Sequence, residues 1–193
     1  YDAYKQILEY EKSVPNIFKY VQFCIVSDGY ETKYFPNYYA EDYSDTLWVW
    51  KSFYPFKEED VKPLKMFPYL DSTIFGMLSK GNLLDLIENF IFVKKYRDTY
   101  IKIIARWMQF RAVNLIVKRV TEEKEKKLGL IWHWQGSGKT LTMAFASWKL
   151  LRNPKLEVPT IFIIVDRRDL QRQIVEEEFA PLGIEIEQIA NIR

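Results

Sequence analysis

A chain of 193 residues has room for one large domain or two small ones. Its apolar content of 48% and charged content of 28% describe a folded, soluble chain. The net charge of +2 is too small to argue for nucleic acid, and no apolar run approaches the roughly 18 residues needed to cross a membrane. Because the first residue is Tyr1, we expect a fragment of a longer protein.

The distribution of charge and the single cysteine set two further bounds. Residues 1–99 hold 12 Lys and Arg against 15 Asp and Glu, a net −3, whereas residues 100–193 hold 16 against 11, a net +5. The positive half suits an anionic ligand but does not require DNA. Cys24 has no partner for an internal disulfide, which favours a reducing compartment such as the cytoplasm, and its apolar surroundings favour a small buried side chain.

The N-terminal segment predicts a helix and an antiparallel strand pair. Apolar residues at helical spacing predict a helix over residues 2–11, and Val14-Pro15 ends it. The aromatic and β-branched run at 18–27 predicts a strand. Asp28-Gly29 is typical of a tight turn, and residues 30–35 alternate like the returning strand.

The middle of the sequence predicts mainly helices. A short strand is expected over residues 46–53, followed by a proline-rich, charged linker at 55–68. Two helices are then expected over 70–80 and 82–94, and the longest helix over 99–125.

Residues 128–150, LGLIWHWQGSGKTLTMAFASWKL, predict an apolar strand, a glycine turn and a helix. Gly136 and Gly138 can take backbone angles that other residues avoid, and without a Cβ they leave room for a phosphate. The N–H groups of the turn and the N-terminal end of the helix attract anions. We expect Lys139 to neutralise the β- and γ-phosphates of ATP and the Thr140 hydroxyl to bind Mg²⁺, so both serve catalysis.

The residues expected to hold the nucleotide phosphates are consecutive: Gln135, Gly136, Ser137, Gly138, Lys139, Thr140 and Leu141. The position where the general phosphate-loop pattern has its first glycine holds His133, and this form of loop resembles that of superfamily 2 helicases. The alternative is a glycine-rich turn with a chance lysine. The flanking apolar strand and amphipathic helix favour the phosphate loop.

Helices and apolar strands alternate after this loop. Asn153-Pro154 stops a helix over residues 142–151, and a continuous apolar strand follows at 160–165. A further strand is expected over 184–189. From Leu128 onward the order is β-α-β-α-β, which predicts a parallel sheet with crossover helices.

Gln109 lies 30 residues before Lys139, in the stretch Ile104–Ala112. A carboxamide pairs with an adenine edge through one donor and one acceptor. The stretch resembles the glutamine-bearing segment of superfamily 2 motors, which implies that Gln109 reads adenine. The alternative is a polar residue on a helix surface.

The stretch Asp166–Gln173 resembles the motor segment usually written Pro-Thr-Arg-Glu-Leu-x-x-Gln, with Asp166 where proline is common. In motors this loop grips the DNA backbone. The resemblance implies that Arg167 and Arg168 bind DNA phosphates, to which arginine makes forked contacts. The alternative is a charged helix start, with Asp169 near its positive end.

Gln6 and Tyr10 are four residues apart, so they share a helix face and fit the pattern Gln-x-x-x-Tyr. In some nucleases of the PD-(D/E)xK class, this pattern lies on the helix after the metal-binding strand. It positions DNA and catalytic groups there, which implies a supporting role for both residues.

Together these motifs resemble the motor subunit of type I restriction enzymes. The most telling stretches are Trp132–Met143 and Val165–Gln173, and residues 15–29 resemble the segment that closes that family's nuclease domain. The resemblance implies ATP hydrolysis with Mg²⁺, translocation and cleavage of double-stranded DNA, and methyltransferase and specificity subunits as partners. It also implies nuclease carboxylates before Tyr1, and acidic metal ligands and an arginine finger beyond Arg193.

The implied fold is α/β: the C-terminal part of a PD-(D/E)xK nuclease domain, followed by the start of a RecA-like, parallel-sheet P-loop motor domain. We expect residues 1–68 to belong to the nuclease, 69–97 to a helical connector and 98–193 to the motor. The chain alone is expected to be inactive. Two alternatives stay open: a stand-alone superfamily 2 DNA helicase or repair motor, and a P-loop nucleotide-binding module without DNA work.

Overall fold

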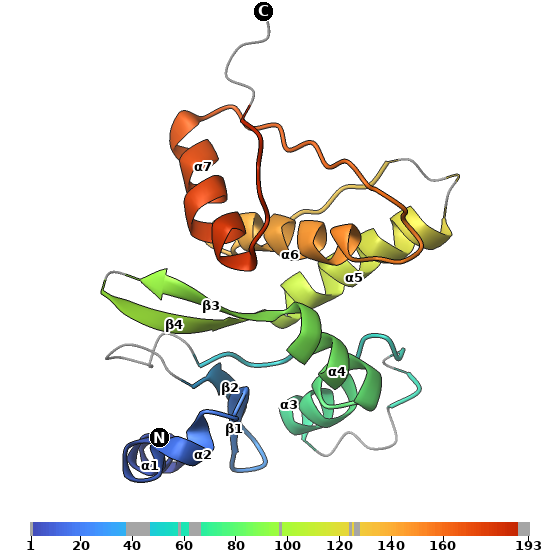
Figure 1. Cartoon of the computed structure of the whole chain (residues 1–193). Coiled ribbons are helices and arrows are strands. Elements are labelled where there is room, and N and C mark those ends of the chain that lie inside the picture. The colour runs from blue at the N-terminus through green and yellow to red at the C-terminus, as the bar shows by residue number, and fades with distance from the viewer. Residues whose placement is uncertain are drawn as a thin grey trace, which may run out of the picture. The chain divides into compact units, whose positions relative to one another are not determined.

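The structure, a computed structural model, describes residues 2–37, 47–57, 59–61, 67–96, 98–123, 125 and 128–188. The chain divides into two compact units, residues 1–111 and 112–193, and the boundary falls inside helix α5 (Trp107–Glu122). Figure 1 colours the elements in chain order from blue to red. Among the described residues, no helix is long and apolar enough to cross a membrane.

The first unit begins with α1 (Asp2–Ser13) and the short α2 (Pro15–Phe18). An antiparallel hairpin of β1 (Phe23–Ser27) and β2 (Thr32–Pro36) follows. The predicted helix and strand pair are therefore confirmed. The first strand starts later than expected, because Pro15 occupies the first position of α2, where its fixed φ favours a helical turn.

The turn of this hairpin is built on one carboxylate. Asp28 Oδ1 accepts the N–H groups of Tyr30 at 2.9 Å and Glu31 at 2.7 Å, and Gly29 adopts a φ of 95°. Aspartate favours such turns because its short side chain bonds the backbone two residues on. The predicted Asp-Gly turn is thus confirmed.

Aromatic side chains form the core of the first unit. The Trp50 ring centroid lies 5.8 Å from that of Tyr34 and 5.4 Å from that of Phe110. Phe90 lies 4.7 Å from Phe110, and each of the four side chains is at most 1% exposed. Aromatic pairs in tilted or edge-to-face geometry add to the stabilisation from apolar burial. This aromatic cluster joins β2 to the first turn of α5.

The strand predicted over residues 46–53 is reduced to one bridge in its described part, and Thr46 lies outside the described residues. Trp48 exchanges backbone hydrogen bonds of 2.8 and 2.9 Å with Tyr34. Two residues later the Trp50 side chain is buried, and its indole N–H donates to the Ser52 carbonyl at 2.8 Å.

Helix α3 (Pro68–Asp71) continues directly into a π-helical segment, η3 (Ser72–Met77), and α4 (Lys80–Asn89) follows. The two predicted helices are present with shifted boundaries. Gly81 lies inside α4 rather than between the helices.

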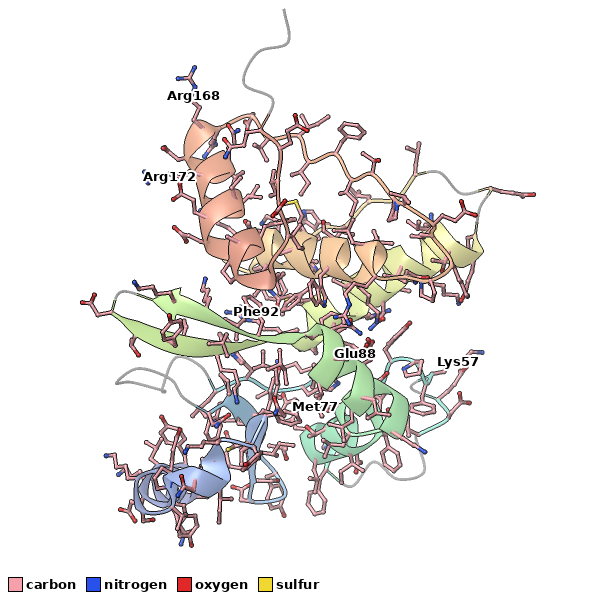
Figure 2. The ribbon with its side chains drawn as sticks, in the orientation of Figure 1. Lys57, Met77, Glu88, Phe92, Arg168 and Arg172 are labelled. Carbon is pink, nitrogen blue, oxygen red and sulfur yellow. The ribbon has the colours of Figure 1, made fainter. Side chains whose placement is uncertain are left out.

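Gly76 of η3 packs against the backbone that carries the aromatic cluster. A Cβ at this position would lie 1.9 Å from the Ser52 carbonyl oxygen and 2.9 Å from Trp50 Nε1. The next residue, Met77, is fully buried, and Figure 2 shows its side chain within the first unit. Glycine therefore allows η3 to approach this backbone closely.

Two strands replace residues that the sequence predicts as helix. β3 (Ile91–Tyr96) pairs antiparallel with β4 (Thr99–Ile104), with Ile91 opposite Ile104. The helix predictions for residues 91–94 and 99–104 are therefore wrong, because both runs are rich in β-branched and aromatic residues, which favour strands. The segment expected as a helical connector is helix up to Asn89 and strand from Ile91.

The second unit is built from helices. α6 (Lys139–Leu151) contacts the π-helical η4 (Gln173–Phe179), which continues from α7 (Arg168–Arg172) and ends in the short η5 (Ala180–Leu182). Phe145 of α6 is fully buried, and Ile174 and Phe179 of η4 are at most 3% exposed. The helix predicted over residues 142–151 is thus confirmed as part of α6, and the second helix of the predicted β-α-β-α-β order is confirmed as α7 and η4.

The strands predicted over residues 128–134, 160–165 and 184–189 have no strand pairing in their described part, and Ile189 lies outside it. The two sheets formed by described residues are antiparallel and two-stranded. Leu130 is 91% exposed and Ile164 is 94% exposed. An apolar run forms a parallel strand only beside a partner brought in by a crossover connection. The predicted parallel sheet is therefore not confirmed.

Candidate nucleotide-binding site

The glycine turn at residues 135–138 has the backbone geometry that the sequence predicts. Gly136 and Gly138 both adopt a φ of 76°, in the left-handed region that favours glycine. The Ser137 N–H donates to the Trp134 carbonyl at 3.3 Å, and α6 begins immediately after Gly138. A helix of 13 residues starting at such a turn presents its N-terminal N–H groups to an anion.

Lys139 folds back over the turn. Its Nζ donates to the His133 carbonyl at 3.2 Å and to the Trp134 carbonyl at 2.9 Å, and the residue is exposed. Both acceptors are neutral, and a charged oxygen makes a stronger hydrogen bond with an ammonium group. The amine therefore lies beside the turn and is bonded there to two neutral acceptors.

The His133 imidazole lies close to this amine. Burial, together with the positive charge of Lys139, lowers the pKa of His133 below its ordinary value, so the ring is neutral at neutral pH. Its Nδ1 is buried without a hydrogen-bond partner among the described residues. His133 thus adds no second positive charge beside Lys139.

The other predicted phosphate-site residues differ in accessibility. Gln135 is exposed, Thr140 and Leu141 are half-buried, and Ser137 is fully buried. A Cβ added to Gly136 would meet no atom within 4 Å, so there is open space beside the turn. These residues fit a nucleotide phosphate group.

Thr140 is the predicted Mg²⁺ ligand of this turn. Its position on the first turn of α6 suits a hydroxyl ligand. Among the described residues, no group of three or more His, Cys, Asp or Glu side chains could hold a metal ion. Thr140 therefore fits as one ligand of Mg²⁺, and the described chain offers no acidic ligand cluster beside it.

Arg167 and Arg168 stand at the start of α7. Arg167 precedes the helix in an extended conformation, and both residues are exposed. Figure 2 shows the side chains of Arg168 and Arg172, one turn apart, projecting away from the helix. The arrangement presents several guanidinium groups to solvent, as the contacts to DNA phosphates predicted for Arg167 and Arg168 require.

Gln109 belongs to the first unit, whereas the glycine turn belongs to the second. The side chain is only 2% exposed, so the surface alternative for this residue is wrong. Gln109 Oε1 accepts the N–H of Arg106 at 2.8 Å. A residue at the third helical position that reaches back in this way caps the helix N-terminus. The sequence did not predict this contact, although Gln three residues after Arg106 fits one half of a capping box.

Gln6 and Tyr10 lie one turn apart on α1, as predicted, and both are exposed. Tyr10 is 49% exposed. The spacing and the exposure fit side chains that support catalytic groups on another segment.

Two family models match separate parts of the chain. Residues 1–43 match the N terminus of the type I restriction enzyme R protein, and residues 108–192 match the SWI2/SNF2 ATPase. A protein of Methanocaldococcus jannaschii, named as a type I restriction enzyme MjaVIIIP endonuclease subunit, is 37% identical over 187 residues. This alignment covers 93% of the chain and 17% of that protein. The type I restriction enzyme HindI endonuclease subunit of Haemophilus influenzae is 32% identical, over 90% of the chain and 16% of that subunit.

The chain belongs with the endonuclease subunits of type I restriction enzymes. It spans less than a fifth of the length of these relatives. No solved structure matches the chain significantly. In this restriction-subunit chain the glycine turn and Gln109 lie within the stretch that matches the ATPase, and Gln6 and Tyr10 lie within the stretch that matches the R-protein N terminus.

Proposed function

We propose that this chain supplies the phosphate-binding loop of an ATP-driven DNA translocase and endonuclease, the restriction subunit of a type I restriction-modification complex. One observation carries the proposal. Two positive-φ glycines lead directly into Lys139 at the start of α6, in a chain related to type I endonuclease subunits. The intact protein would act on double-stranded DNA in the cytoplasm, together with methyltransferase and specificity subunits.

Each residue of the loop has a separate role in this proposal. The backbone N–H groups that follow Gly136 and Gly138 donate hydrogen bonds to phosphate oxygens. Lys139 exchanges the carbonyls of His133 and Trp134 for the β- and γ-phosphates. Thr140 binds Mg²⁺, which neutralises charge that develops on the phosphates.

The remaining predicted residues complete the proposal. Gln109 reads the adenine edge, Arg167 and Arg168 hold DNA phosphates, and Gln6 and Tyr10 support nuclease carboxylates that precede Tyr1. Exposure supports the roles of the two arginines, of Gln6 and of Tyr10. The acidic Mg²⁺ ligands and the arginine finger would come from beyond Arg193, so residues 1–193 alone should neither hydrolyse ATP nor cut DNA.

We also propose that the apolar runs 128–134 and 160–165 are strands of a RecA-like parallel sheet in the intact protein. The support is the pattern of exposure in the second run: Phe162 is 77% and Ile164 is 94% exposed, while the alternate residues Ile161, Ile163 and Val165 are half-buried. Alternating apolar exposure of this kind suits a strand with a partner face. In this proposal residues 98–193 begin the motor domain, 69–97 connect it, and 1–68 end the nuclease domain.

Substituting Lys139 in the intact protein tests the function. Lys139→Ala should lower DNA-stimulated ATP hydrolysis by about 100-fold or more, because it removes the positive charge on the phosphates. DNA cleavage by the assembled complex should fall with it, because cleavage depends on translocation.

The matched control is Lys155→Ala, at a lysine that is 61% exposed and pairs only loosely with Glu122 at 3.5 Å. Its ATPase rate should equal that of the wild type. Normal hydrolysis in the Lys139 variant would overturn the motor assignment. Lysine-dependent hydrolysis with no DNA cleavage by the wild-type complex would instead indicate a plain superfamily 2 motor.

A further inference from the structure

One face of the β3–β4 hairpin changes from buried to exposed along its length. Alternate residues of β4 share this face, and their exposed fractions are 4% at Ile104, 8% at Lys102 and 67% at Tyr100. The residues opposite them on β3 include Val93, which is 51% exposed, and Lys95, which is also exposed. Figure 1 shows the paired strands running away from α4. The described residues of the first unit therefore leave the outer end of this face open.

The covered half of the face is held by the N-terminal segment. Lys102 Nζ donates to Asn37 Oδ1 at 2.6 Å and to the Val21 carbonyl at 2.7 Å. The Asn37 amide in turn donates to the Phe18 carbonyl at 2.7 Å, and Asn37 is 1% exposed. Buried polar groups that have found their partners fix the orientation of the elements that carry them. The base of the hairpin is therefore a rigid support for its outer end.

The outer end carries two hydrogen-bond donors on one surface. Lys95 lies directly opposite Tyr100 in the strand register. The side chains of such a cross-strand pair point to the same face, with Cβ atoms about 4.5–5.5 Å apart. An ammonium group and a phenol hydroxyl both donate to phosphate oxygens in protein–DNA complexes, the first as a charged donor and the second as a neutral one.

The charge of the hairpin differs from that of the chain before it. Residues 1–90 hold 9 Lys and Arg against 14 Asp and Glu, a net −5, whereas residues 91–104 hold 4 against 1, a net +3. Without the buried Lys102 the hairpin still has a net charge of +2. Salt screens exposed charges beyond about 10 Å at 0.1 M, so the local excess decides what binds at this surface. The hairpin therefore suits a polyanion that the acidic residues before it do not attract.

We propose that the outer end of the β3–β4 hairpin contacts the backbone of double-stranded DNA, with Lys95 and the Tyr100 hydroxyl binding phosphates. The inference rests on the proposed action of the intact protein on DNA. It adds a contact in the first unit to the arginines of α7 in the second. Phosphate contacts carry no base sequence, so the hairpin holds DNA of any sequence.

The test measures binding of the intact protein to a duplex of arbitrary sequence, by fluorescence anisotropy without ATP, from about 50 to 200 mM salt. Lys95→Ala removes one phosphate contact. It should lower the affinity about fivefold near 0.1 M salt and reduce the slope of log affinity against log salt by about 1. Tyr100→Phe deletes a neutral donor, so the affinity should fall about threefold while the slope stays unchanged.

Lys57→Ala is the matched control in the same unit. Lys57 is exposed and lies 3.6 Å from the Glu59 carboxylate, and Figure 2 shows its side chain projecting outward. Its affinity and slope should equal those of the wild type. Because Lys95 and Tyr100 are exposed, the thermal unfolding midpoint should not change in either hairpin variant. Lys95→Gln keeps most of the side-chain stem and replaces Lys95→Ala if that midpoint falls.

The outcomes separate the hairpin contact from the proposed function. Normal affinity and slope in the Lys95 variant, together with weaker binding on replacement of Arg168, overturn the hairpin contact and leave the proposed function intact. No DNA binding by the wild type overturns both. An equal loss in Lys57→Ala shows that affinity follows net charge and overturns the contact. Hairpin variants that bind DNA normally but fail to assemble with the other subunits assign the surface to a protein partner, which also overturns it.

Discussion

The two units differ in how their apolar segments are covered. In the first unit, short antiparallel hairpins and an aromatic cluster enclose one another, and Tyr34, Trp50, Phe90 and Phe110 are at most 1% exposed. In the second unit, helices bury one another, but Leu130 and Ile164 are more than 90% exposed. Hairpin strands find their partners nearby in sequence, whereas parallel strands depend on distant ones. The comparison shows that apolar composition alone does not decide which segments become strands.

The largest expected effect comes from truncating the buried Phe110 of the first unit, in contrast to the exposed Phe162 of the second. Phe110→Ala should lower the free energy of opening of β3 and β4 by about 3–5 kcal/mol, because it opens a cavity in the aromatic cluster. Native-state hydrogen exchange of the intact protein measures this opening. A loss within about 0.5 kcal/mol, as at surface sites, would mean that the cluster does not hold the first unit together.

The same change at Phe162 sharpens the comparison. The proposed parallel sheet predicts that Phe162→Ala costs more than about 2 kcal/mol in the intact protein, where neighbours would cover the side chain. Hydrogen exchange at residues 160–165 is the measurement. A cost within about 0.5 kcal/mol would contradict the sheet and agree with the 77% exposure seen here.

A smaller effect is expected from two lysines that bind asparagine side chains. Lys102 Nζ donates to Asn37 Oδ1 at 2.6 Å and to the Val21 carbonyl at 2.7 Å, and the residue is 8% exposed. Lys102→Met should cost about 1–3 kcal/mol, because it leaves buried acceptors without a donor. Urea unfolding of the intact protein, monitored by hydrogen exchange at the amides of the first unit, measures this loss of free energy.

Lys149 of the second unit is the matched comparison. Its Nζ donates to Asn114 Oδ1 at 2.6 Å, and the residue is only half-buried. Lys149→Met should cost about 0.5–1.5 kcal/mol, since water replaces the lost donor more easily. Equal costs at both lysines would remove the distinction between a closed first unit and a more open second one.

The smallest effect is a pH dependence of the β1–β2 hairpin. The N–H groups of Glu31 and Tyr30 lower the pKa of Asp28 below its ordinary value of 3.8. A lowered carboxyl pKa stabilises the fold above the unfolded pKa, and this contribution is lost as the pH falls through the folded value. Thermal unfolding between about pH 5 and pH 2 should therefore show a decline that Asp28→Asn weakens. An identical decline in the variant would assign the effect to other carboxyls.

Local sequence signals predicted the parts of the molecule that depend on nearby residues. Asp28-Gly29 turns the first hairpin, and Gly136 and Gly138 lead into α6, because these turns need specific backbone angles that a few residues supply. The spacing of Gln6 and Tyr10 likewise placed both on one face of α1.

Burial and pairing over long distances were not predictable in the same way. Residues 91–94 and 99–104 have apolar side chains that also fit helical spacing, so only their β-branched character pointed to strands. The cap that Gln109 makes depends on the neighbouring backbone of Arg106, and the stack of Arg106 on Trp48 joins residues 58 positions apart. No periodicity in the sequence reports such a contact.

Gly76 has a consequence for how this protein varies and how it can be engineered. Any side chain at this position collides with the Ser52 backbone, so mutational scanning should find almost no tolerated replacement. Gly81 is the opposite case, because a Cβ there meets nothing within 4 Å. Replacing Gly81 with alanine should raise the stability of α4 by about 0.5–1 kcal/mol. This gain could compensate for destabilising substitutions elsewhere in the first unit.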